Sequence, residues 1–309
     1  MTTTAGSWLR PVADADYRAP STHKRRGIVL ALVGFVIAAI AFFGNLAAAG
    51  LSDSARETTL AWTFGVTTTG FTVIKTGIAV VLWGILVKLW LRAESIKTSL
   101  ATLVGIPGVD RVRTGELDTP FGKVEVTDKA PGDLGVHKMA RTMFRPMLVM
   151  GVMGVLAGLI ISFVWAGTVP NTAAAAWTQG LQFLGEAMLL SGISFLLGTI
   201  LWAIRTAGGE VQEHLGVKVQ TPKMPASAKT FVAIMMFGLI AAIVQFIGYL
   251  AVAGSNDPSV AFTWLGPLRE FALGTILAAI TLALASIANV LAFQFHRVQE
   301  LIRSGERSS

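Results

Sequence analysis

The stretch GFVIAAIAFFGNLAAAG, residues 34–50, recurs twice in this chain as diverged copies. The other copies are GVMGVLAGLIISFVWAG at residues 151–167 and GLIAAIVQFIGYLAVAG at residues 238–254. A tryptophan follows each copy, and a second long apolar run follows each tryptophan. Apolar runs of this length span a bilayer as helices, and a fixed internal spacing indicates tandem repeats. The sequence therefore predicts an all-α membrane protein of six transmembrane helices, arranged as three tandem helical hairpins.

Glycines mark the two ends of each copy. Small residues allow membrane helices to approach closely, which favours packing where no hydrophobic drive between helices exists. One polar or amphipathic residue also recurs at a matching position, as Asn45, Ser162 and Tyr249. We expect the end glycines to mark the repeat and to pack helices, and they are Gly34, Gly50, Gly151, Gly167, Gly238 and Gly254.

The composition excludes most catalytic chemistry. The 309 residues are 53% hydrophobic and only 14% charged, and they include no cysteine, so disulfides and thiol-based sites are absent. The four histidines lie outside the middle of the apolar runs, and no nucleotide-binding or hydrolase motif occurs. The sequence predicts a protein that is not an enzyme and that carries no cofactor and no metal.

The net charge of +7 reflects membrane topology. Basic residues concentrate before the first run, in the two long connections and after the last run, whereas the three short connections hold only Arg56. Positive charge stays on the cytoplasmic side, so both termini and both long connections are expected in the cytoplasm. We expect a plasma membrane location, as in a bacterial inner membrane, and no nucleic-acid partner. The expected spans are 28–51, 62–91, 147–169, 175–204, 229–254 and 264–295.

Short polar segments precede the hairpins. Lys123–Val126 and Val217–Val219 alternate in polarity as short strands do, and a β-hairpin is expected around Asp118–Gly122. Gly122, Thr127, Lys129 and Pro131 match Gly216, Thr221, Lys223 and Pro225 at one constant offset, so these segments are either repeated arms or unrelated loops. The expected organisation is an arm at 1–27, hairpins at 28–91, 147–204 and 229–295, a cytoplasmic loop with a possible small β-hairpin at 92–146, an arm at 205–228 and a tail at 296–309.

The outer ends of the hairpins carry interfacial signals. Ser52–Asp53, Asn171–Thr172 and Asn256–Pro258 offer N-caps for the second helix of each pair. Indole rings favour the membrane interface. We therefore expect Trp62, Trp177 and Trp264 to be interfacial anchors.

Four charged residues lie inside the predicted spans. Counted inward from the tryptophans, Arg269, Glu186 and Lys75 lie about 8, 14 and 20 Å deep at 1.5 Å per residue. An unpaired charge at such depth costs about 2.5–3.5 kcal/mol on insertion scales. We expect Lys75, Glu186, Arg269 and the neighbouring Glu270 to form an intramembrane charge network, in which Lys75 and Glu186 pair. Thr67, Thr72, Thr76, Gln182 and Ser194 add hydrogen-bonding groups at similar depth.

Two functional hypotheses remain open. In the first, the charges fix helix register in a non-catalytic structural or accessory subunit, which associates with other membrane subunits or with itself. In the second, they line a path for a small solute or ion through a transporter or channel. The plan of three hairpins resembles that of mitochondrial carriers, but the Pro-x-acidic-x-x-basic signature of that family is missing at residues 51–56, 169–174 and 254–259. The resemblance is one of architecture alone.

Overall fold

Six long helices make up most of the protein. The computed structural model describes residues 19–99, 115–119, 122–127, 135–214, 219–224, 226–255 and 259–306. Within these ranges, six helices are long and apolar enough to cross a membrane, so the chain is a multi-pass membrane protein that lies in a lipid bilayer. They are α1 (Ala19–Ala48), α2 (Asp53–Ser99), α3 (Gly135–Gly167), α4 (Thr172–His214), α5 (Ala226–Ala253) and α6 (Ser259–Glu306).

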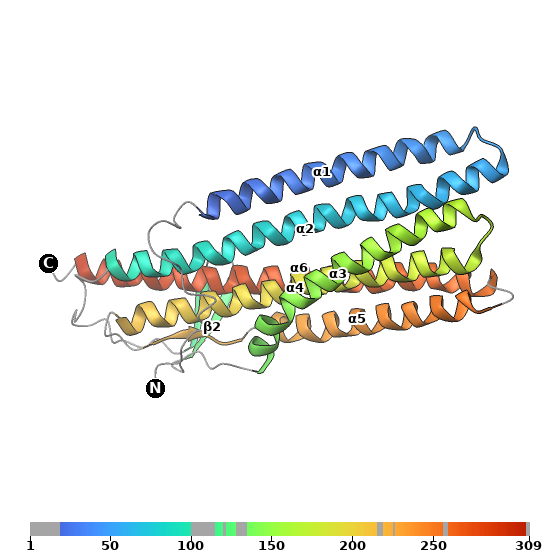
Figure 1. Ribbon diagram of the computed structural model, residues 1–309. Helices are drawn as coiled ribbons and strands as arrows, with labels where there is room; N and C mark the ends of the chain where they lie inside the picture. The colour runs from blue at the N-terminus through green and yellow to red at the C-terminus, as the bar shows by residue number, and fades with distance from the viewer. Residues whose placement is uncertain are drawn as a thin grey trace.

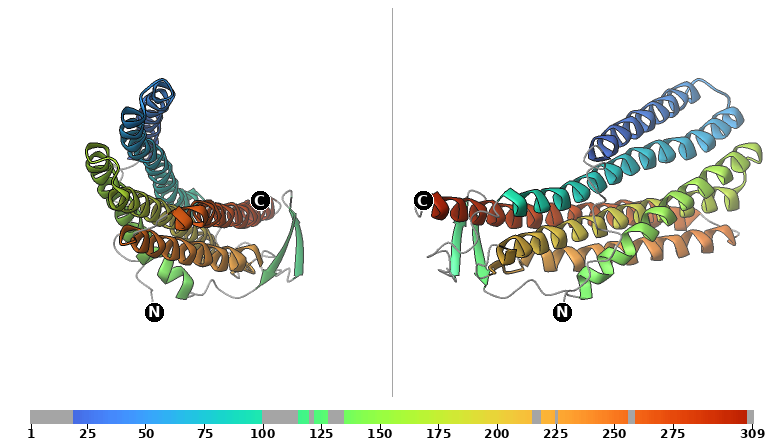
Figure 2. Two further views of the ribbon diagram at one scale, coloured as in Figure 1. Left: turned by 90° about the vertical axis from the view of Figure 1, so that its right-hand side faces the viewer. Right: turned by 60° about the vertical axis from the view of Figure 1, so that its left-hand side comes forward.

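Consecutive helices pack in pairs around α4. The C-terminal ends of α1, α3 and α5 and the N-terminal ends of α2, α4 and α6 all lie at the same end of the molecule (Figure 1). Helix α4 packs against α2, α3, α5 and α6, whereas α1 packs along α2. The end-on view shows the α1–α2 pair diverging from the α5–α6 pair (Figure 2). The core of the protein therefore centres on α4.

The helices extend beyond the predicted spans. Those spans end at residues 91, 204 and 295, but α2, α4 and α6 continue to Ser99, His214 and Glu306. Hydropathy locates only the part of a helix that crosses the bilayer, and the polar residues that follow are themselves good helix formers. Likewise α3 starts at Gly135 and contains Pro146, which interrupts one hydrogen bond without ending the helix.

A small antiparallel sheet lies at the end of the molecule opposite the N-terminal ends of α2, α4 and α6 (Figure 1). The predicted β-hairpin is confirmed, as β1 (Gly115–Thr119) pairs with β2 (Gly122–Thr127). A strand was also expected at 217–219. Val219 is not in a strand, so this expectation is wrong at that residue, and residues 217 and 218 lie outside the described residues. The strand lies slightly later, as β3 (Thr221–Pro222), and Thr221 pairs with Thr127. Thr127 and Thr221 are also the residues matched by the constant offset in the sequence.

The expected N-cap of a second helix is confirmed for α4. The side-chain oxygen Oδ1 of Asn171 accepts a hydrogen bond of 2.9 Å from the backbone N–H of Ala174, so Asn171 caps α4. The backbone oxygen of Ser52 accepts the first bond of α2 from Arg56 N–H, at 2.7 Å. The third expected cap, 256–258, lies outside the described residues.

Three of the predicted packing glycines lie in close helix contacts. A Cβ placed on Gly34 would meet the backbone oxygen of Gly70 at 2.5 Å, and a Cβ on Gly151 would meet the backbone nitrogen of Leu189 at 2.6 Å. At Gly238, the nearest atom would be Ile276 Cγ1 at 2.7 Å. These distances are too short for a real Cβ, so each glycine lets the two helices of a pair approach closely.

The other three predicted packing glycines lie at helix ends. A Cβ on Gly167 would meet nothing within 4 Å, and one on Gly50 or Gly254 would meet only a backbone oxygen three residues earlier, at 3.9 Å. Close packing between helices therefore does not explain Gly50, Gly167 and Gly254. They lie where the chain leaves the first helix of each pair.

Candidate functional site

The intramembrane charges lie together around Glu186. Glu186 is buried in the middle of α4, with a side chain only 4% exposed. The ammonium Nζ of Lys75 on α2 lies 2.5 Å from Glu186 Oε1 and donates a hydrogen bond to it. A carboxylate in a low-dielectric interior is stable only when it is paired and hydrogen-bonded. Lys75 supplies both interactions from a neighbouring helix.

Arg269 approaches the same carboxylate from α6. Its Nη2 lies 3.8 Å from Glu186 Oε2, so each oxygen of Glu186 faces a different cation. The guanidinium also stacks over the ring of Phe183, 3.7 Å from the ring centroid, which adds a cation–π attraction. One carboxylate on α4 is thus held by cations from α2 and α6.

Glu270 lies at the edge of this cluster. Its Oε1 is 3.7 Å from Arg269 Nε, but its side chain is 75% exposed on the surface of the single chain. Lys75 and Arg269 are intermediate, at 23% and 29%. The two cations balance the two carboxylates, and exposure rises from the centre at Glu186 toward Glu270.

Glutamine side chains join the helices on either side of the cluster. Gln182 Nε2 donates a hydrogen bond of 3.1 Å to the backbone oxygen of Gly65, which links α4 to α2. Tyr249 Oη donates one of 3.0 Å to Gln179 Oε1, which links α5 to α4. Gln245 of α5 reaches the Leu265 backbone oxygen in α6 at 3.1 Å. Gln182 and Tyr249 were expected at polar positions inside the spans, whereas Gln179 and Gln245 were not, although a glutamine inside an apolar run is itself a signal.

Hydroxyl groups of α2 and α4 divide into two sets. Thr76 and Ser194 donate to backbone oxygens of their own helices, at 2.8 and 3.0 Å. The second set is buried without a hydrogen-bond partner, and its members are Thr67 Oγ1, Thr72 Oγ1, Thr178 Oγ1 and Ser191 Oγ. A buried hydroxyl without a hydrogen-bond partner costs the full free energy of removing it from water, because no hydrogen bond in the protein replaces those it made to water. Gln182 Oε1 of α4 is likewise buried without a hydrogen-bond partner.

The three tryptophans lie near the starts of α2, α4 and α6. Trp177 and Trp264 are about half exposed, and Trp62 is partly buried near Gly44 of α1. Trp177 also contacts the Phe246 ring edge-on, with 6.4 Å between the centroids. These positions fit side chains that face both neighbouring helices and the surroundings of the protein.

A second polar cluster ties the sheet end to the helices. Gln212 of α4 exchanges two hydrogen bonds of 2.8 Å with the backbone N–H and oxygen of Gln220. Arg297 Nε of α6 donates to Gln212 Oε1 at 3.4 Å, and Arg205 Nη2 donates to the Pro222 backbone oxygen at 3.4 Å. All these residues are buried, so the segment before α5 is held against α4 and α6.

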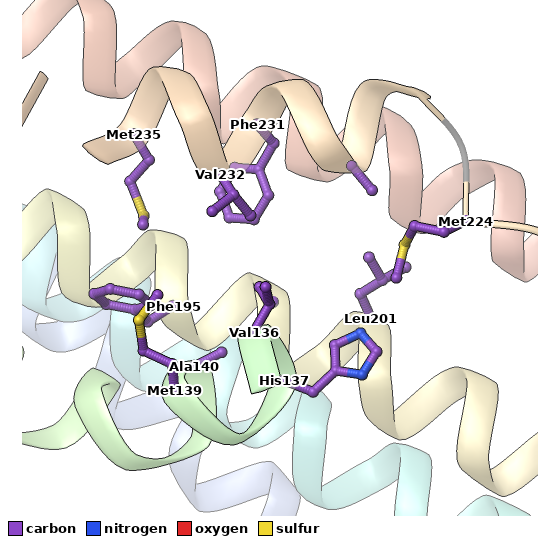
Figure 3. A pocket seen from close by; sticks show the side chains of 12 residues that line it. Val136, His137, Met139, Ala140, Phe195, Leu201, Met224, Phe231, Val232 and Met235 are labelled. Carbon is purple, nitrogen blue, oxygen red and sulfur yellow. The ribbon is translucent and has the colours of Figure 1, made fainter. Parts of the chain in front are cut away.

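A cavity opens near the same end, between α3, α4 and α5 (Figure 3). Its lining is apolar apart from His137, with Met139 and Met235 toward one end and Met224 beside His137 at the other. No sequence pattern marks these residues as a site. Comparison with family models, curated proteins and solved structures finds no match for this chain. Its function is therefore inferred from the geometry of the charge cluster and of the helix packing.

Proposed function

We propose that this protein is a non-catalytic structural or accessory subunit of a membrane assembly. The observation that carries the proposal is the buried Glu186 carboxylate, which is paired with Lys75 of α2 and Arg269 of α6. Removing one member of a buried pair typically costs about 3–5 kcal/mol. A closed set of ion pairs between three helices therefore favours a fixed arrangement over one that opens and closes.

We also propose that α1–α2, α3–α4 and α5–α6 are hairpins 1, 2 and 3 of a triplicated unit. Support comes from matching contacts counted from the tryptophans. Gly34, Gly151 and Gly238 each lie against the eighth and twelfth residues after the tryptophan of their own hairpin. These partners are Gly70 with Ile74, Gly185 with Leu189, and Ala272 with Ile276. Unrelated hairpins have no reason to use the same positions.

The proposed orientation places the sheet, both termini and the long connections in the cytoplasm of a cell whose plasma membrane holds the six spans. Basic residues concentrate in these segments. The helices α2, α4 and α6 have 47, 43 and 48 residues, about twice the length that a bilayer requires, and their excess lies toward the sheet. In this proposal the repeated arms and the helix extensions form a cytoplasmic platform for partner subunits.

A second candidate function is transport of a small solute or ion. One observation favours it: the partly exposed Lys75 lies one helical turn after Thr72 on α2, and the Thr72 hydroxyl is buried without a hydrogen-bond partner. Charged groups inside a membrane often mark an ion or substrate path. In that case Glu186 would be the binding group that a solute approaches.

A flux measurement separates the two functions. The purified protein is reconstituted in liposomes loaded with fluorescent reporters of protons, potassium ions and chloride, and leakage is compared with that of protein-free liposomes. The proposal predicts no flux above the protein-free level. Flux that disappears in Glu186→Gln, but persists in a Glu270→Gln control, would establish the transport function and contradict the structural one.

A further inference from the structure

Hairpin 2 packs against hairpin 1 through one particular glycine. A Cβ on Gly65 of α2 would lie 2.7 Å from Ser162 Cβ and 3.3 Å from Leu159 Cδ1, both on α3. Gly65 is buried, and the next turn of the same face carries the buried Thr68. The first helix of hairpin 2 therefore lies directly on the second helix of hairpin 1.

Hairpin 3 packs against hairpin 2 in the same way. A Cβ on Gly180 of α4 would lie 3.0 Å from Tyr249 Cβ and 3.3 Å from Phe246 Cδ2, both on α5. Phe183, on the next turn, is buried, and its ring contacts the ring of Tyr249 at a tilt of 56°, with 5.9 Å between the ring centroids. Gly65 and Gly180 are each the third residue after their tryptophan, and Ser162 and Tyr249 occupy the same place in their repeats. One interface is thus used twice along the chain.

The equivalent face of hairpin 3 is uncovered. The third and sixth residues after Trp264 are Pro267 and Glu270, and both are exposed, although their counterparts in hairpins 1 and 2 are buried. Gly266 and Gly274 lie one turn to either side of Glu270, and a Cβ on either would meet nothing within 4 Å. A carboxylate on an open face of a transmembrane helix is costly in lipid.

The complementary face of hairpin 1 is uncovered too. In α1 the residues equivalent to Leu159 and Ser162 are Phe42 and Asn45. Phe42 is 57% exposed and Asn45 is exposed, whereas Ser162 and Tyr249 are fully buried. Among the described residues, hairpin 1 and hairpin 3 each present one unoccupied side of an interface that forms twice within the chain.

We propose that a second copy of this chain fills the uncovered face, with α1 of one copy packed on α6 of the next. Phe42 and Asn45 would lie over Pro267 and Glu270, and the Asn45 amide would donate a hydrogen bond to the Glu270 carboxylate. The argument rests on continuity with the two internal interfaces, and hence on the triplication proposed above. Because the two faces differ, the contact is heterologous and produces either a closed ring or an open row of copies.

Cysteine crosslinking in membranes tests this contact. The chain has no native cysteine, so two differently tagged single-cysteine chains, Asn45→Cys and Pro267→Cys, can be co-expressed and oxidised. The two internal counterparts bring their Cβ positions to 2.7 and 3.0 Å, within reach of the ~3.5–4.5 Å of a disulfide after a small shift, so a crosslinked dimer carrying both tags is expected. Ile160→Cys on the exposed side of α3 replaces Asn45→Cys in the control, and should give no such dimer. Absence of the Asn45–Pro267 crosslink, or a dimer joined through two Asn45→Cys chains, would overturn the proposal.

A blocking substitution gives an independent readout. Gly266→Leu has free space in the single chain but would obstruct the incoming α1, so the assembly should be lost while the monomer stays folded. Gly167→Leu also has free space, lies away from this face, and should leave the assembly intact. Equal assembly of the two variants would contradict the proposal.

The outcomes also separate this inference from the proposed function. A missing crosslink, together with liposomes that show no flux, would remove the self-assembly and leave a structural subunit with another partner. A crosslink accompanied by flux through Glu186 would keep the assembly and replace the structural function by transport.

Discussion

Lys75→Met is the substitution that most sharply probes the ion-pair cluster. At an effective dielectric constant of 20, two unit charges attract by about 7 kcal/mol at 2.5 Å and about 4 kcal/mol at 3.8 Å. Desolvation offsets most of this attraction, so the cost of breaking a buried pair is about 3–5 kcal/mol. Arg269 still faces Glu186 in the variant. We therefore expect a loss near the lower limit, about 3 kcal/mol.

A double-mutant cycle that combines Lys75→Met with Glu186→Gln measures the interaction between these two side chains alone. The single variants Lys75→Met and Glu186→Gln should each destabilise the protein, and the double variant should regain most of the loss because neither charge is then left without its partner. Equilibrium unfolding in bicelles measures the free energies, and the expected coupling is about 2–3 kcal/mol. Lys88→Met is the matched control on an exposed part of α2, and should change little. If the two single effects simply add, Lys75 and Glu186 do not stabilise the fold as a pair.

Two further predictions follow from the topology and the packing. A cysteine at Ser54 should react with an impermeant thiol reagent applied outside the cell and one at Thr119 should not; the reverse pattern would overturn the proposed orientation. Gly151→Ala should lower the free energy of unfolding by about 1–3 kcal/mol, because its Cβ meets backbone atoms of α4, whereas Gly167→Ala, with open space around it, should not. Equal stability of the two glycine variants would show that α3 and α4 can separate at no cost.

The long apolar runs made the six helices predictable from sequence. Hydropathy marks the bilayer-crossing part of a helix strongly, so the spans were located, but it cannot mark where a helix ends in water. That is why the continuation of α4 to His214 and the start of α3 at Gly135, before Pro146, were not foreseen. The β3 strand has two residues, and its place at Thr221 depends on pairing with β2 across a long stretch of chain.

The candidate site, like the fold, could be predicted from the sequence only in part. Charged residues in apolar runs are conspicuous, and counting depth from the tryptophans selected Lys75, Glu186 and Arg269 as possible neighbours. Which side of each helix faces its neighbour depends on crossing angles that hydropathy does not contain. The stacking of Arg269 on Phe183, and the bond between Tyr249 and Gln179, therefore emerge only from the packed structure.

The mass of the protein extracted from its own membrane tests the proposed role as an assembly subunit most directly. Extraction in lipid nanodiscs formed by an amphipathic polymer, followed by native mass spectrometry, keeps weak membrane contacts intact. The proposal predicts particles heavier than one 32.7 kDa chain, which contain further copies or other subunits, and a loss of the multiple-copy species in Gly266→Leu. Particles that contain only a single 32.7 kDa chain at native expression levels would contradict it.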